Sequence, residues 1–201
     1  MRRADKIAQV FTALLDTSVL WPSLQRDFLL SLAIEGMYRP VWSAAILEEL
    51  EYHETAKLIR RGEASGEAAQ RALRLVTQMR SAFADAEVHG WQGLEGTYGL
   101  PDPDDEHVVA AAVVAGAGAI ITHNLRHFPP DRLPIGISAL PPAEFAASTV
   151  SLDPARAQAA VAAIVARSGR RGPPLTEDEV LDTLANRYGM TRTAEVIRPV
   201  R

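Results

Sequence analysis

Short apolar runs that stop abruptly at a polar residue alternate along this chain with segments of helical periodicity, and this alternation constrains the fold most. Residues 10–15 form one such run, which ends at Asp16, and residues 119–122 form another. Runs of this length fit buried strands better than helices. Weaker strand candidates lie at residues 38–42, 86–89 and 135–140. Strands that alternate with helices predict an α/β fold with a mainly parallel central sheet flanked by helices.

The helices between these strands are predicted from apolar periodicity, N-cap residues and terminal glycines. Ser43 is one such cap, and Gly36 closes the helix before it. A loop is expected at residues 90–100, which contain four glycines. The predicted helices cover residues 20–35, 43–59, 65–83 and 103–115.

The character of the chain changes after residue 142. An Ala-rich helix at residues 153–166 begins with an Asp–Pro pair, in which Asp is the cap and Pro takes the first helical position. A Gly/Arg/Pro linker follows at residues 168–174, and Thr176-x-x-Glu179 is a capping box that opens a further helix. We therefore expect an α/β domain at residues 1–145 and a helical extension at residues 146–201.

Composition and missing motifs exclude several classes of function. The chain has no cysteine, so disulfide scaffolds, thiol catalysis and Cys-ligated metal sites are excluded. Residues 108–122 are too short for a membrane span, and the basic residues 1–6 do not lead into a signal peptide. Phosphate-binding loops of the P-loop and Rossmann type and the serine-hydrolase elbow are absent from the sequence. We expect a cytoplasmic protein without membrane contact.

The formal net charge of −4 argues against broad, sequence-independent binding to nucleic acid. A local basic track is still open, because six basic residues lie within residues 57–80, against Glu63 and Glu67. All but two of the 21 basic residues are arginines, whose planar side chains bind phosphate through two donors. A solvated helix face and a phosphate-binding track both fit this segment.

Polar side chains are expected to converge at one edge of the sheet, because ligands of parallel α/β sheets gather beyond the carboxyl ends of the strands. Asp16 follows the first strand, Thr122 and Asn124 stand at the end of the 119–122 strand, and Asp105 begins the helix that leads to that strand. Asp102 fits a helix N-cap, but four acids among residues 102–106 exceed what a cap requires.

A further carboxylate is expected from the helix at residues 43–59. Glu49 aligns with the edge of the apolar face, whereas Glu48 and Glu51 align with a polar stripe. Carboxylates that converge repel one another and raise each other's pKa unless a cation neutralises them. Mg²⁺ or Mn²⁺, which prefer oxygen ligands, is the natural cation for such a site. The spacing of His123 and His127 also occurs in metal sites, but no third soft ligand accompanies it. The other histidines, at positions 53, 89 and 107, are interpreted as surface or helix-packing residues.

Four motifs follow one another between about residues 10 and 145. They are Leu-Leu-Asp-Thr-Ser-Val-Leu at residues 14–20, Ser43-x₅-Glu49, Pro-Asp-Pro-Asp-Asp-Glu-His-Val at residues 101–108 with Ala-Ala-Ala at residues 110–112, and Ile-Thr-His-Asn-Leu-Arg-His-Phe-Pro at residues 121–129. In this order and spacing they resemble the motifs of PIN-domain nucleases. The subgroup that the chain resembles is the VapC-type toxin ribonucleases of toxin–antitoxin pairs, and the helical tail is also similar to one found in that subgroup.

The resemblance implies a PIN-like fold and an endonuclease of single-stranded RNA that uses Mg²⁺ or Mn²⁺. By motif position, Asp16, Glu49 and Asp105 match the family's metal-binding and catalytic acids, and Asp102 matches a frequent companion. Asn124 stands where many members carry Asp, so it supplies an oxygen ligand without a charge and weakens a second metal position. The resemblance further implies a cognate antitoxin, an RNA substrate and a homodimer.

Metal-assisted hydrolysis also gives a role to neighbouring hydroxyls, because Thr17, Ser18 or Thr122 can orient water or phosphate. Two alternatives remain. A non-catalytic PIN module that binds RNA or a partner is favoured by Asn124. A phosphoryl-transfer enzyme with Asp16 as nucleophile is disfavoured, because position 18 carries Ser rather than a second Asp.

Overall fold

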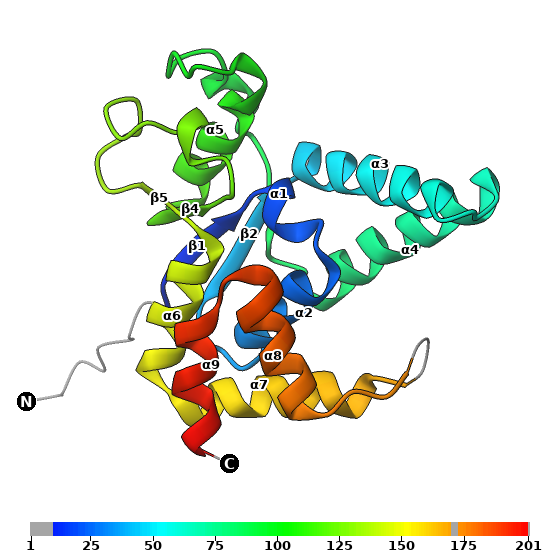
Figure 1. Ribbon diagram of the computed structural model, residues 1–201. Helices are drawn as coiled ribbons and strands as arrows, with labels where there is room; N and C mark the ends of the chain where they lie inside the picture. Colours follow the sequence, from blue (N-terminus) through cyan, green and yellow to red (C-terminus); the bar gives the residue numbers. More distant parts are fainter. Residues whose placement is uncertain (1–9, 170–172, 201) are drawn as a thin grey trace, which may run out of the picture.

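The structure is a computed structural model that describes residues 10–169 and 173–200 (Figure 1). The basic segment at residues 1–6 and the centre of the predicted linker at residues 168–174 lie outside the described residues.

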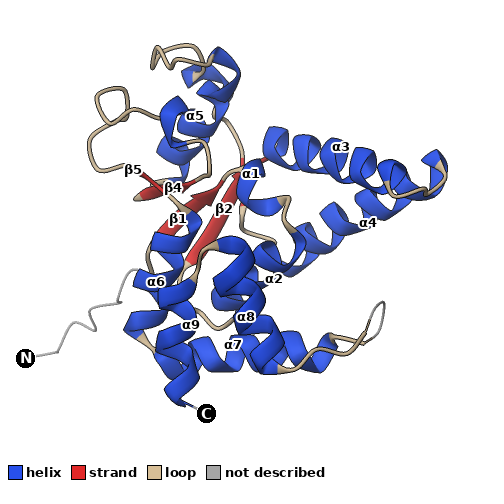
Figure 2. Ribbon diagram, viewed as in Figure 1, coloured by secondary structure: helices blue, strands red, loops and turns tan. Residues whose placement is uncertain are grey.

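The centre of the molecule is a five-stranded sheet in the order β3-β2-β1-β4-β5, drawn in red in Figure 2. Every pairing between these strands is parallel, which confirms the predicted α/β class and the mainly parallel sheet. β1 lies in the middle, where Leu14 pairs with Val41 on one side and with Ile120 on the other. The strands are β1 (Thr12–Leu15), β2 (Arg39–Ser43), β3 (Glu87–Val88), β4 (Ala119–Ile121) and β5 (Ser138–Leu140).

Helices surround this sheet, and most begin where the sequence predicts. The helix predicted at residues 20–35 begins instead at Ser23, after a separate short helix at Thr17–Leu20, because Pro22 has extended backbone and no N–H to continue that first helix. Two tail helices, α6 and α9, were not predicted individually. The helices are α1 (Thr17–Leu20), α2 (Ser23–Ile34), α3 (Ala44–Arg60), α4 (Ser65–Ala82), α5 (Glu106–Ala115), α6 (Pro142–Leu152), α7 (Pro154–Arg167), α8 (Glu177–Tyr188) and α9 (Thr191–Ile197).

The tail helices pack on the sheet domain rather than standing apart from it (Figure 1). α7 packs along α2, and α6 packs against α9. The ring of Tyr38, just before β2, meets the ring of Phe145 on α6 edge-on at 4.8 Å. One continuous apolar core therefore includes both parts, and the division at residues 145 and 146 stays a prediction.

Burial of the three central strands fixes the edge at which the candidate side chains meet. Leu14, Leu15, Val41 and Ile120 are fully buried, so the strands have one register and end at a common edge. Two short 3₁₀ turns adjoin this edge. The turn at Pro103–Asp105 directly precedes α5, and the turn at Leu125–His127 follows β4. None of the described helices is long and apolar enough to cross a membrane.

Candidate functional site

Asp16 lies at the carboxyl end of β1, and only 5% of its surface is exposed. Its backbone N–H donates to the carbonyl of Ile121 on β4 at 3.1 Å, so the end of one strand is held against the end of the other. The hydroxyls of Ser18 and Thr122 donate to its Oδ2 atom, at 2.6 and 2.7 Å. Both of these hydrogen bonds reach Oδ2, and no side chain of the described residues donates to Oδ1.

The two hydroxyls that hold Asp16 are themselves held by the loop after β4. The backbone N–H of His123 donates to Ser18 Oγ at 3.1 Å, and that of Asn124 donates to Thr122 Oγ1 at 2.9 Å. Each hydroxyl therefore donates to the carboxylate and accepts from the backbone. This arrangement gives Ser18 and Thr122 a positioning role toward Asp16, and their direct contact with water or phosphate stays a prediction.

Glu49 lies near the start of α3, whose N-cap Ser43 accepts a hydrogen bond from the N–H of Ile46. The Thr17 hydroxyl donates to Glu49 Oε2 at 2.6 Å, and His107 Nε2 lies 3.1 Å from Oε1. Burial raises the pKa of Glu49, but the hydrogen bonds from His107 and Thr17 outweigh it and hold the pKa below its usual value. The helical phase inferred from the sequence agrees with these contacts, since Glu48 is exposed.

His107 is a residue of this site that the sequence interpretation missed. It is buried on the first turn of α5, beside the ring of Trp91 at 5.8 Å. Burial lowers the pKa of His107, but the hydrogen bond and charge of Glu49 raise it above its usual value overall. Its Nδ1 atom has no hydrogen-bond partner among the described residues. The one signal in the sequence was its place two residues after Asp105.

Asp105 and Asp102 meet a second imidazole, that of His127. His127 Nδ1 lies 2.6 Å from Asp105 Oδ2 and 3.7 Å from Asp102 Oδ2. Burial raises the pKa of Asp105, the hydrogen bond with His127 lowers it, and the nearby charge of Asp16 raises it again, so the pKa is above its usual value overall. Asp16 therefore lies close enough to Asp105 for their charges to repel.

The predicted acids thus converge, but not as one tight group. Within residues 10–169 and 173–200, a set of three ligand atoms that all lie within 4.8 Å of one another is found at Asp102, Asp105 and His127. Asp16 adjoins this set, and Glu49 is connected to it through Thr17, the residue after Asp16. The side chain of Asn124 is exposed, and its backbone carbonyl accepts from the His127 N–H at 2.9 Å.

Two of the acids of residues 102–106, Asp102 and Glu106, accept hydrogen bonds from backbone N–H groups. Asp102 Oδ1 accepts from the N–H of Asp104 and so caps the 3₁₀ turn as predicted. Glu106 is buried, and its two carboxylate oxygens accept from the backbone N–H groups of Tyr98 and Leu100 at 3.0 and 2.9 Å. Asp104 is exposed. Of these acids, Asp102 and Asp105 therefore lie at the sheet edge, and Glu106 anchors the loop that precedes them.

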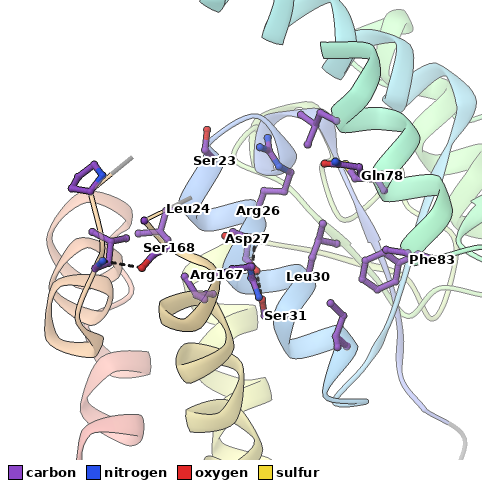
Figure 3. A pocket seen from close by; sticks show the side chains of 18 residues that line it. Ser23, Leu24, Arg26, Asp27, Leu30, Ser31, Gln78, Phe83, Arg167 and Ser168 are labelled. Atoms are coloured by element: carbon purple, nitrogen blue, oxygen red, sulfur yellow. Dashed lines mark hydrogen bonds and ion pairs between the residues drawn. The ribbon is translucent and has the colours of Figure 1, made fainter. Parts of the chain in front are cut away.

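A cavity of about 870 Å³ lies elsewhere, between α2, the end of α4 and the end of α7 (Figure 3). Arg167 crosses it and donates to Asp27 and to Ser31, at 3.0 and 2.6 Å. Apolar side chains such as Leu30 and Phe83 line much of the rest. None of the converging acids lines this cavity, so it is separate from the candidate site.

Comparison with known proteins agrees with this geometry. Residues 12–126 match the family model of the PIN domain, and residues 142–199 match that of the VapC50 C-terminal domain. The chain is 40% identical over 81 residues to the "Putative ribonuclease VapC50" of Mycobacterium tuberculosis (strain ATCC 25618 / H37Rv). That alignment covers 40% of this chain and 47% of the relative, so the chain spans about half of the curated protein it matches. No solved structure matches the chain significantly.

Proposed function

The chain belongs to the PIN-domain family, and from this premise we propose that it is a metal-dependent endoribonuclease that cuts single-stranded RNA as the toxin of a toxin–antitoxin pair. The observation that carries the proposal is the convergence of Asp16, Glu49 and Asp105 at the carboxyl edge of the sheet. We further propose a cognate antitoxin, a homodimer and a cytoplasmic location, as the resemblance to VapC-type toxins implies.

The residues at this edge fit a divalent cation. Three ligand atoms of Asp102, Asp105 and His127 lie within 4.8 Å of one another, and the buried Asp16 adds a further carboxylate beside them. We assign Mg²⁺ or Mn²⁺ to Asp16, Glu49, Asp105 and Asp102, with the amide oxygen of Asn124 as a neutral ligand. When bound, the metal lowers the pKa of a water and stabilises negative charge on the phosphate.

The protein's own contribution is to hold these carboxylates in place. Ser18 and Thr122 fix Asp16, while Thr17 and His107 each donate to one oxygen of Glu49. Carboxylates oriented in this way need little rearrangement when a cation and a phosphodiester arrive. The hydroxyls therefore support the site by orienting its acids.

The basic segment at residues 57–80 lies on the hairpin of α3 and α4, which extends from the body of the molecule (Figure 1). Lys57 pairs with Glu54, Arg71 with Glu63, and Arg80 with Glu87. The other three basic residues, Arg60, Arg61 and Arg74, form no ion pair within the part of the chain that the structure describes. We propose these three as contacts for the RNA backbone, which the acids would otherwise repel.

The purified protein is expected to cut single-stranded RNA with Mn²⁺ or Mg²⁺ and to be inactive with EDTA. Its expression alone is expected to arrest growth, and co-expression of its antitoxin to relieve the arrest. The measurements are gel analysis of cleaved RNA and growth curves.

Binding of RNA without cleavage in either metal would favour the second candidate, a non-catalytic PIN module. The neutral and exposed Asn124 is the observation that favours this candidate. Active protein in vitro with unaffected growth would instead contradict the toxin role.

Glu49→Gln is expected to lower RNA cleavage about 30-fold, or about 2 kcal/mol of transition-state stabilisation. The amide keeps an acceptor for His107 but loses the charge that attracts a cation. Glu48→Gln and Glu51→Gln serve as matched controls on the same helix and are expected to stay within about twofold of wild type. Initial cleavage rates measure the effect, and melting curves show that each variant is folded. Sensitivity at Glu48 in place of Glu49 would contradict the assignment.

A further inference from the structure

An exposed group of aromatic side chains lies next to the candidate site. Trp21 is the C-cap of α1, and Tyr52 and His53 lie on α3. The ring centroids of Trp21 and His53 are 6.4 Å apart and those of Tyr52 and His53 are 5.4 Å apart, both edge-on. Trp21 is 37% exposed and Tyr52 71% exposed. We call these three residues the aromatic cluster.

The aromatic cluster is coupled to the carboxylates through both of its helices. α1 begins directly after Asp16, and its first residue, Thr17, donates to Glu49. His53 follows Glu49 by one helical turn, about 6 Å along the axis of α3, so the two side chains share a face. The aromatic cluster therefore lies along α3 within one helical turn of the carboxylate of Glu49.

Cationic side chains accompany the rings. The Nζ atom of Lys57 lies over the ring of Trp21, 5.8 Å from its centroid, but its side chain is only 12% exposed and pairs with Glu54, so it orients the ring rather than binding phosphate. Arg60 and Arg61 follow at the end of the same helix and are exposed. Exposed aromatic faces with flanking cations are the combination that binds single-stranded nucleic acid, because every base has a face that stacks and every phosphate carries a charge. A protein partner needs no such alignment with the carboxylates.

We propose that the aromatic cluster is a subsite that stacks unpaired bases of the RNA beside the phosphate to be cut, with Trp21 as the main stacking ring. The proposal rests on the ribonuclease function proposed above and adds how its substrate is held. Stacking of this kind is tolerant of base identity, so the subsite selects unpaired RNA over duplex rather than one sequence.

Binding is measured by fluorescence anisotropy with a short, fluorescein-labelled single-stranded oligoribonucleotide of mixed sequence, in an Asp16→Asn background that prevents cleavage. Trp21→Ala is expected to raise the Kd about 10-fold, and Trp21→Phe to retain most of the affinity. Tyr52→Ala, a change of a largely exposed side chain that leaves the fold intact, is expected to raise the Kd about threefold. Leu152→Ala, at an 80% exposed apolar residue at the end of α6, is the matched control and is expected to have no effect.

A series of oligonucleotides with one abasic position each tests stacking directly. At the position that stacks on Trp21, removal of the base is expected to cost the same affinity as Trp21→Ala, and the two changes together no more than either alone. Trp21 also supplies the accessible tryptophan emission, since Trp42 and Trp91 are buried. RNA is expected to quench this emission in the background protein and not in Trp21→Phe.

The outcomes separate this proposal from the proposed function. Wild-type protein that cuts RNA, together with an unchanged Kd in Trp21→Ala and Tyr52→Ala, overturns the subsite and leaves the ribonuclease in place. If Trp21→Ala loses the same RNA affinity on intact and on abasic oligonucleotides, the subsite is also overturned, because the contribution of the ring then does not depend on a stacked base. If Trp21→Ala and Tyr52→Ala change the oligomeric state in analytical ultracentrifugation while their RNA affinity is unchanged, the subsite is overturned and the cluster is instead a contact between copies of the chain. Wild-type protein that neither binds nor cuts RNA overturns both proposals.

Discussion

Asp16→Asn is expected to lower RNA cleavage at least about 100-fold, which corresponds to about 2.7 kcal/mol of transition-state stabilisation. The amide has nearly the size of the carboxylate and keeps an oxygen that can accept from Ser18 and Thr122. What is lost is the charge at the buried end of β1, where a cation would be held. The fold is expected to survive, and without metal the melting temperature is expected to hold or rise, because repulsion between Asp16 and Asp105 is relieved.

The same substitution at Asp105 is expected to have an effect of the same size, and Asp104→Asn provides its matched control. Asp104 belongs to the same 3₁₀ turn but is exposed, so its change is expected to alter cleavage less than about twofold. Titration calorimetry with Mn²⁺ gives a readout that does not depend on cleavage, and weaker binding is expected in Asp16→Asn and Asp105→Asn. Wild-type cleavage activity in either variant would contradict the assignment of these acids to the metal site.

The sheet could be predicted because the sequence signal of each strand lies within a few consecutive residues. Each strand is a short apolar run with polar limits, and the parallel arrangement follows from the helices between the strands. The caps at Ser43, Asp153 and Thr176 were also readable, since each side chain bonds a backbone N–H within three residues. Helix α6 could not be predicted from the sequence, because Thr149 and Val150 have weak helical propensity and its apolar face is defined by packing against α9.

The candidate site was predictable where it depends on strand ends and helical phase, as for Asp16 and Glu49. The two imidazoles were not, because their contacts join elements far apart in the sequence. His107 is 58 residues from Glu49, and His127 is 22 residues from Asp105. Residues 106–112 of α5 are all buried, so the helix has no polar face from which the direction of His107 could be inferred.

Glu106→Ala is expected to lower the free energy of unfolding by about 3 kcal/mol, which chemical denaturation at neutral pH measures. The buried carboxylate accepts from the backbone N–H groups of Tyr98 and Leu100, and hydrogen bonds to a charged group contribute about 1.5–3 kcal/mol each. Part of this contribution is offset, because the variant no longer buries a charge. Asp104→Ala, two residues earlier and exposed, is expected to cost less than about 1 kcal/mol. Equal costs in the two variants would contradict the anchoring role of Glu106.

The pH dependence separates the charge of Glu106 from its shape. Burial raises the pKa of Glu106, but the N–H groups of Leu100 and Tyr98 outweigh this and hold it below the usual value of 4.5. A carboxyl group whose pKa is lower in the folded protein stabilises the fold above its unfolded pKa and loses that contribution as the pH falls through the folded pKa. Glu106→Gln cannot titrate at this position, so its deficit in unfolding free energy is expected to be full at neutral pH and to shrink below about pH 4.5. A deficit that stays constant as the pH falls would show that the side chain acts through its shape, and that its charge adds nothing to the loop it holds.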